Sequence, residues 1–335
     1  MQRIRWWAET LVFPSIILGT MVPAGVLLTQ GAPAWVTAFQ GWAGPGLGGQ
    51  LAAFAAWLLD LGYFETIVVM GTIFVSFSLQ LGLQRWLPYR PDWRNWKPDL
   101  AVDLVHMFFS NGLGTSLARA AFLPLAIAGH AWVTSSFGGV PWPVDWPWVV
   151  QLALALVIGD LGIYWLHRLS HEWMPLWRLH ALHHSSEHMS LLASVRIHPL
   201  QMPLNWLTQT APLVFLGAGP EILALHTLFT AVHGQLQHAN IAQRLGPLSY
   251  IFATVEAHRW HHSTDLDEGH TNYGNNILLW DHLFGTFHLP GGEPDEVGIG
   301  VSYPRNVFLH LASPWLLDRW SAPLVDESEE QVPAK

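Results

Sequence analysis

The sequence has no cysteine among its 335 residues, which excludes disulfide bonds and thiolate metal ligands. Any metal must therefore be bound through nitrogen or oxygen atoms. Charge is scarce as well: charged residues make up 12% of the chain, against roughly 25% in ordinary soluble domains. The formal net charge is −9, which argues against nucleic acid as a partner. A GxGxxG dinucleotide fingerprint after a strand is also missing, because the nearest match, residues 44–49, stands between apolar segments.

The chain is instead rich in apolar and aromatic residues. Hydrophobic residues account for 51% of it, and 20 residues are tryptophan. Tryptophan is typical of the two interfaces of a membrane protein. No polar linker divides the apolar part, so the composition predicts one integral membrane domain with an all-α fold.

Apolar runs long enough to cross a bilayer predict about four transmembrane helices. The third run is interrupted by Asn111, Arg119 and Pro124, so we expect either one kinked span or two shorter helices. A later pair of shorter runs, hinged at residues 217–220, predicts a re-entrant or hairpin pair. The first run favours a retained anchor over a cleaved signal peptide, since no small-residue cleavage site ends it. The four long runs cover residues 11–28, 67–83, 104–133 and 149–165. A Gly/Pro-rich turn at 31–49 and an interfacial lead-in at 52–61 precede the second run. The shorter pair covers residues 202–216 and 222–232.

Basic residues predict the orientation of these spans. Arg3, Arg5 and the basic segment 85–97 belong on the cytoplasmic side by the positive-inside rule, whereas loop 134–148 has no Lys or Arg. The fourth span then ends on the cytoplasmic side, where the histidine-rich segments follow. We therefore divide the chain into N-terminal transmembrane helices (1–145), a catalytic region (146–290) and a C-terminal tail (291–335). The histidine-rich segments of the catalytic region are expected to form a helical cap on the cytoplasmic side.

Three histidine clusters are the main chemical signal. Residues 167–184 contain five of the 19 histidines, and residues 258–262 contain three more. The offsets of three and four residues place rings on one side of a helix. A single catalytic zinc usually takes about three protein ligands, so the eight histidines of these clusters predict a site for two metals. The ligands predicted from spacing are His167, His171, His180, His183, His184, His258, His261 and His262.

Other functions fit these clusters less well. A lone histidine is usually a structural residue, but three clusters, two of them with the HxxHH pattern, are hard to explain by chance. A membrane zinc hydrolase would show HExxH with a glutamate base, and here Arg168, Ala181 and Arg259 follow the first histidine of each box. A metal transporter would need ionisable residues at the membrane midplane rather than at helix ends. A catalytically inactive metal-binding protein remains an alternative, although none of the boxes is broken.

The boxes resemble those of a known family. HRLSH (167–171), HALHH (180–184) and HRWHH (258–262) are similar to the HxxxH, HxxHH and HxxHH boxes of the fatty acid hydroxylase/sterol desaturase superfamily. The segment NYGNNILLWDHLFGTF (272–287) and QHAN (237–240) also resemble that superfamily, and HHSSEHMSL (183–191) resembles its alkylglycerol monooxygenase branch and bacterial relatives. The resemblance covers about residues 160–287. It adds His238, in QHAN, as a ninth metal ligand.

The resemblance implies a non-haem di-iron monooxygenase that uses O2 to hydroxylate or desaturate a membrane lipid such as a sterol, a fatty acyl chain or an ether lipid. Zinc could replace iron in the site. Neutral imidazole suits iron, and a metal must carry the oxidation of an unactivated C–H bond. Since no dinucleotide fingerprint is present, we expect a separate ferredoxin or cytochrome b5 type electron carrier and a reductase. The predicted docking surface for an acidic carrier consists of Arg168, Arg178, Arg196 and Arg259.

Some polar residues are expected to support the ligands. A metal-bound histidine usually donates its second N–H to an acceptor. We predict Asp160 and Asp281 in this role, because an unpaired carboxylate in an apolar run is costly. His233 is predicted to lie behind the ligands, and His198 is left open. The remaining candidates for support are Glu172, Glu187, Glu256, His188, His270, His282 and His288, while His106, His130, His226 and His310 are predicted to be structural.

Overall fold

The computed structural model describes residues 2–30, 64–94, 99–139, 141–301 and 303–316. The described part is helical and contains no β-strand, only two isolated bridges, Phe252 to Ile277 and Ser263 to Val297. The all-α prediction is therefore confirmed. The predicted turn at 31–49 and the lead-in at 52–61 lie outside the described residues, as does Lys97.

Four helical segments are long and apolar enough to cross a membrane. Each matches one of the predicted runs. They expose many large apolar side chains, such as Phe74 (70% exposed) and Phe108 (72% exposed). Soluble proteins rarely expose so much apolar surface, so these faces are suited to contact lipid. The segments are α1 (Gln2–Gln30), α4 (Phe64–Trp86), the continuous run of α5 (Leu100–Val105), η2 (His106–Gly114) and α6 (Thr115–Phe137), and α7 (Trp148–Glu172).

The interrupted third run is one long helical segment rather than two helices. Its interruption is a π-helical stretch, η2, which leaves backbone carbonyls with altered partners. Asn111, one of the polar residues in the run, donates from its side-chain amide to the carbonyls of His106 and Val195. The polar residue therefore ties the π-helical stretch to the segment that follows the second histidine box.

The predicted hairpin is present. It descends through α9 (Gln201–Gln209) and α10 (Ala211–Leu216), and turns at Gly217, whose φ of 88° suits glycine. The returning helix, α11 (Pro220–His238), is 19 residues long and continues past residue 232. It packs against α1, α4 and α7, with Leu225, Leu228 and Val232 fully buried. The hairpin core thus places His238 beside the histidine boxes.

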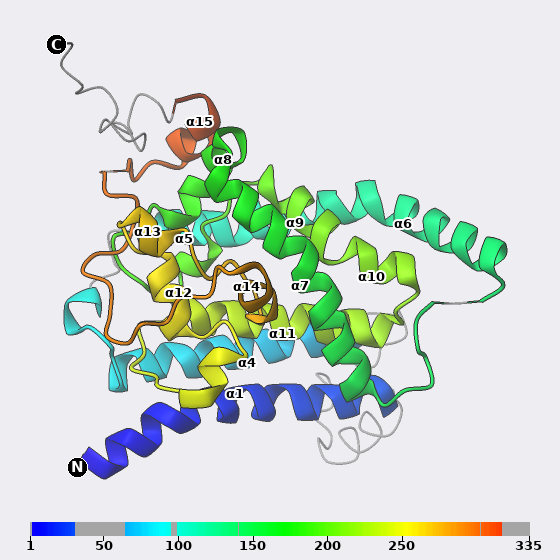
Figure 1. Cartoon of the computed structure of the whole chain (residues 1–335), viewed down its shortest axis with the longest axis horizontal. Coiled ribbons are helices and arrows are strands. Elements are labelled where there is room, and N and C mark those ends of the chain that lie inside the picture. Colours follow the sequence, from blue (N-terminus) through cyan, green and yellow to red (C-terminus); the bar gives the residue numbers. More distant parts are fainter. Residues whose placement is uncertain (1, 31–63, 95–98, 140, 302, 317–335) are drawn as a thin grey trace, which may run out of the picture.

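The histidine boxes form a cap at one end of the bundle (Figure 1). The N-terminal end of α1, the end of α4 and the C-terminal end of α7 all lie at this end (Figure 1). The common side agrees with the predicted arrangement of the basic segments and the boxes. The cap consists of η1 (Pro91–Arg94), α8 (Met174–His184), η3 (Ala193–Val195), η4 (Gly246–Tyr250), α12 (Val255–His261), α13 (Leu266–Gly269), α14 (Leu279–Phe284) and α15 (Val307–Leu316).

Candidate metal centre

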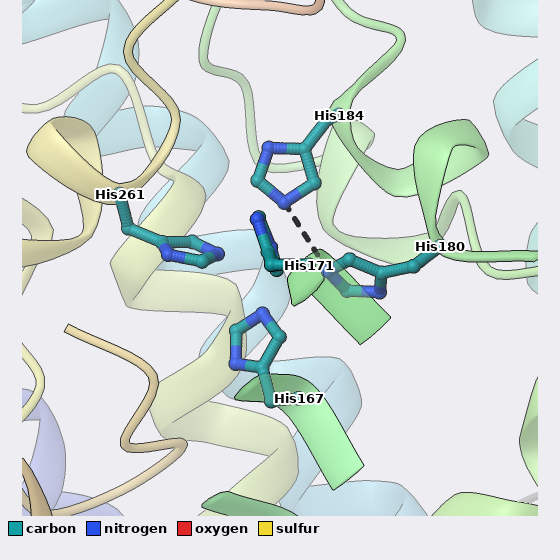
Figure 2. Close-up of side chains that lie close together, drawn as sticks. All are labelled: His167, His171, His180, His184 and His261. Atoms are coloured by element: carbon teal, nitrogen blue, oxygen red, sulfur yellow. Dashed lines mark hydrogen bonds between the residues drawn. The ribbon is translucent and has the colours of Figure 1, made fainter. Parts of the chain in front are cut away.

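All nine predicted ligands come together in two compact groups. Within each group, one nitrogen atom from every ring lies within 4.8 Å of the others. The first group lies around the end of α7 (Figure 2). It consists of His167, His171, His180, His184 and His261, and the second group consists of His183, His238, His258 and His262. The two-site prediction from the sequence matches this arrangement.

Each HxxHH box contributes to both groups. On α8, His180 and His184 belong to the first group and His183 to the second. On α12 and the residue after it, the division is reversed, with His261 in the first group and two rings in the second. Residues three and four apart on a helix point in directions that differ by a fraction of a turn. The spacing therefore lets one short helix supply neighbouring sites.

The rings of the second group face one another through their Nε2 atoms. His238 Nε2 lies 3.1 Å from His183 Nε2 and 3.0 Å from His258 Nε2. His258 Nε2 is in turn 3.1 Å from His262 Nε2. In the first group, His180 Nε2 and His184 Nε2 are 3.2 Å apart (Figure 2). The buried Nε2 atoms of the other three rings of that group have no hydrogen-bond partner.

The hydrogen bonds of the Nδ1 atoms indicate the protonation state of the Nε2 atoms that face one another within each group. Nδ1 of His167, His238 and His261 each lie 2.8 Å from a backbone carbonyl. A carbonyl only accepts, so these Nδ1 atoms carry the proton and the Nε2 atoms of a neutral ring present lone pairs. Several lone pairs facing one another at this distance repel unless a cation lies among them. The donor set therefore fits a bound metal in each group.

The protonation state of the cap histidines also fits metal binding. Burial, together with neighbouring imidazoles, lowers the pKa of His184, His261 and His262 well below the usual 6.5. The rings are therefore neutral at pH 7. Neutral imidazole is the form that binds metals.

The predicted carboxylates, Asp160 and Asp281, do not accept hydrogen bonds from the ligand rings, which corrects the sequence-based expectation. Asp281 accepts hydrogen bonds from the backbone N–H groups of Tyr273 and Gly274, at 2.7 and 2.8 Å. Asp160 accepts from the backbone N–H groups of Asn276 and Ile277, at 2.7 and 2.6 Å. Neither carboxylate contacts a ligand ring. They fix the loop instead, and the carbonyl of Tyr273 then accepts the Nδ1 proton of His167.

Gln201 was not among the residues predicted to support the ligands. Nε2 of its side-chain amide lies 2.9 Å from Nδ1 of His180, and the amide can turn over to present its oxygen there instead. Since His180 directs Nε2 into the group, Nδ1 carries the proton, and the amide must offer its oxygen. Gln201 lies 21 residues from its partner. No spacing rule would have connected the two.

We expect Gln201→Leu to weaken metal binding by about 10- to 100-fold, the usual effect of removing a partner of a ligand ring. The leucine leaves the Nδ1 proton of buried His180 without an acceptor. Chelator titration of the purified variant measures the change in affinity. Gln201→Glu keeps an acceptor at the same place and should restore most of the affinity, whereas equal weakening by both substitutions would show that only packing was disturbed.

The other histidines lie outside both groups. His233, predicted to support the ligands, packs among Phe13, Phe229 and Phe252 instead. His198 lies 3.2 Å from the carbonyl of Leu311. Three of the four histidines predicted to be structural have partners away from the centre: His106 and His310 contact each other, and His130 contacts the carbonyl of Phe215. His188 lies near Asp99, His282 near the carbonyl of Tyr250, and His288 against Trp260.

A cavity of about 250 Å³ reaches the first group from the surface of the cap. His171, His184 and His261 form its inner wall. Trp177 and the partly exposed Leu266 lie on its outer part. His270 also lines the cavity, and the centroid of its ring lies 5.6 Å from the ring centroid of His171. The first group is therefore open to small molecules from outside the cap.

The sequence is similar to known proteins over the region that carries the histidine boxes. The family model described as fatty acid hydroxylase matches residues 152–286. The ornithine lipid hydroxylase OlsE of Rhizobium tropici is 37% identical over 236 residues, which is 69% of this chain and 71% of that protein.

More distant relatives share a shorter region. The alkylglycerol monooxygenase of Xenopus tropicalis is 32% identical over 199 residues, covering 59% of this chain and 43% of that protein. Human lathosterol oxidase is 27% identical over 176 residues, covering 52% and 57%. The chain therefore spans about half the length of these two relatives. No solved structure matches significantly. The histidine boxes, the apolar helices and the extended match to a named lipid hydroxylase show that the chain is a membrane enzyme of the fatty acid hydroxylase family.

Proposed function

We propose that this enzyme is an O2-dependent oxidoreductase that hydroxylates a C–H bond of a membrane lipid, with two iron ions in its histidine groups. The observation that carries the proposal is the pair of groups of facing Nε2 atoms at the end of an apolar helical bundle. Bound iron would supply the redox chemistry that oxidation of an unactivated C–H bond requires. Two of the named relatives are hydroxylases or monooxygenases, which favours hydroxylation over desaturation.

The chain itself contributes orientation and a water-poor surrounding. Backbone carbonyls and Gln201 direct the Nε2 atoms inward. Seven of the nine rings are less than 9% exposed: His180, His183, His184, His238, His258, His261 and His262. A dry site of this kind strengthens the field around a bound ion and keeps water from competing with substrate. The lipid reaches the cap along the exposed apolar faces of the membrane helices.

The zinc hydrolase alternative is weaker. Such an enzyme needs a carboxylate base next to the metal. Among the described residues, both groups consist of histidine alone. Glu172, which follows the first box, forms an ion pair with Arg168 at 2.8 Å.

Lipid analysis tests the proposed reaction. Cells that produce the wild-type chain should accumulate a lipid about 16 mass units heavier than its precursor, because one oxygen atom is inserted. A loss of about two units would indicate desaturation instead. Cells producing His261→Ala provide the matched control and should lack the product. An unchanged lipid profile in cells with metal-loaded wild-type protein would contradict the proposal.

We also propose that the cap faces the cytoplasm, and we expect cysteine labelling to show it. The chain has no cysteine of its own, so Ser135→Cys and Glu187→Cys each introduce a single thiol. Ser135 lies near the end of α6 and Glu187 follows the second box, so they belong to opposite ends of the bundle. A membrane-impermeant thiol reagent added to intact cells should label position 135 and spare position 187. Labelling of position 187 from outside would reverse the proposed orientation.

A further inference from the structure

A second cavity, of about 490 Å³, lies on the other side of the segment that follows the second histidine box. Three parts of the chain enclose it: the start of α5, residues 185–196 and the segment leading into α15. Unlike the cavity that reaches the first histidine group, its wall carries charges of both signs. These are supplied by Asp99, Glu187, Arg196 and Arg305.

Two of these charges are buried and fixed. Asp99 and Arg196 are 3% and 4% exposed, and Arg196 Nη2 lies 3.3 Å from a carboxylate oxygen of Asp99. Nε of Arg196 also contacts the carboxylate of Asp103 inside α5. This guanidinium still has its buried Nη2 without a hydrogen bond that meets normal geometry. Arg196 therefore places a buried positive charge in the wall of the cavity.

The other two charges are accessible. Arg305 Nε lies 2.9 Å from Asp99, but its side chain is 58% exposed. Glu187 is exposed and has no ion pair in the described part of the chain. A molecule in the cavity thus meets a guanidinium that can change partner and a carboxylate with no partner.

The cavity lies where the cap meets the membrane-facing surface. Asp99 directly precedes the third membrane-capable segment, and Ser185 directly follows the ligand His184. The helix α15 exposes Phe308 (80%) and Trp315 (71%). Its buried His310 stacks on His106 of η2 at 5.3 Å between ring centroids, so α15 packs against the third membrane-capable segment. An apolar helix face beside a membrane helix is typical of an element in the lipid interface.

We propose that this cavity binds the headgroup of the substrate lipid and selects a zwitterionic headgroup, one that carries an ammonium and an anionic group. The inference rests on the proposed function for the identity of the lipid as substrate. The ammonium pairs with Glu187 and Asp99, and the anionic group pairs with Arg305 and Arg196. A purely anionic headgroup would place like charge next to Glu187, and a neutral one would leave Glu187 without an ion pair. The name of the ornithine lipid hydroxylase describes a lipid of the proposed class.

Binding of defined lipids to the full-length, metal-loaded protein without reductant tests the site, because no turnover occurs. Native mass spectrometry from detergent micelles gives the dissociation constants of ornithine lipid, phosphatidylethanolamine, phosphatidylglycerol and diacylglycerol. The first two are zwitterionic and should bind at least about tenfold more tightly than the last two. The tighter of the first two shows whether the anionic group is a carboxylate or a phosphate. Equal binding of phosphatidylglycerol would overturn the proposed selectivity.

Two substitutions locate the binding to this cavity. Arg305→Gln and Glu187→Gln each remove one accessible charge-assisted contact and should weaken binding of the preferred lipid about tenfold. Arg119→Gln, at an exposed position on α6, is the matched control and should have no effect. Metal content should remain that of the wild type in all three. Unchanged binding in both cavity variants would overturn the site, even if the wild-type protein hydroxylates lipid. Selective binding without any hydroxylation would contradict the proposed function and leave the site in place.

Discussion

Replacing His261 with alanine is expected to lower the metal content of the purified protein from about two ions per chain to about one. His261 contributes its Nε2 atom to the first group alone, and the ring is fully buried. Its Nδ1 atom is fixed by the carbonyl of Thr271 at 2.8 Å. Alanine therefore removes an oriented ligand that no neighbouring side chain replaces. The second group, which does not contain this ring, should keep its ion.

The measurement is elemental analysis of protein from iron-supplied cells after dialysis against a chelator. Lipid oxidation should fall by at least about 100-fold, because losing a ligand costs more than losing the partner of one. His258→Ala should have the complementary effect on the second group. His130→Ala removes a histidine near the end of α6 and should change neither value. Retention of both ions by His261→Ala, or a wild-type content of about one ion per chain, would contradict the two-metal assignment.

The offsets within the boxes explain why the sequence alone led to the site. In HALHH and HRWHH, rings three and four residues apart on one helical turn must approach one another, whatever the rest of the fold does. The apolar runs likewise predicted the membrane-capable helices, because a lipid-exposed segment must form its hydrogen bonds internally. His238 was different. It was predicted from the resemblance of QHAN to a family motif and from its position 20 residues before His258, and its place in the second group depends on α11 returning to the cap.

Contacts between distant segments could not be predicted in the same way. Gln201 of α9 reaches His180 of α8 because both helices pack against α7, and no local pattern records that packing. Asp160 and Asp281 were correctly singled out as buried carboxylates, but the partners they bind are backbone N–H groups of residues 273–277. An apolar run indicates that a charge needs a partner. It does not indicate which partner the fold supplies.

The predicted docking surface for an electron carrier needs the same correction. Arg196 is 4% exposed and pairs with Asp99 and Asp103. Arg259 is 6% exposed and lies over the ring of Tyr89, 3.5 Å from its centroid. Burial lowers the pKa of Arg259 to about 9, and the same burial keeps its guanidinium away from the surface. These two arginines therefore cannot attract an acidic carrier. We therefore expect the rate to depend only weakly on salt.

The need for a separate electron carrier does not depend on that surface. Insertion of one oxygen atom of O2 into a C–H bond, with the second atom released as water, consumes two electrons and two protons from outside the substrate. The sequence has no dinucleotide fingerprint opening a helix after a strand, and the described residues form no strand. We therefore propose that a ferredoxin or cytochrome b5 type protein and its reductase deliver the electrons to the metal groups.

Purified, metal-loaded protein supplied with lipid, O2 and NADPH alone is expected to form no hydroxylated product, and addition of the carrier and its reductase should start turnover. Omitting the carrier while keeping the reductase separates the two roles, and the rate should then return to background. Mass spectrometry of the lipid gives the product, and oxidation of NADPH should match it one to one. The cavity lined by His171, His184 and His261 leads to the first group, so we expect a carrier to bind next to it. Leu266→Glu, at the exposed edge of that cavity, should slow turnover with the carrier while leaving metal content unchanged. Full turnover of the isolated chain with NADPH would refute the requirement for a partner.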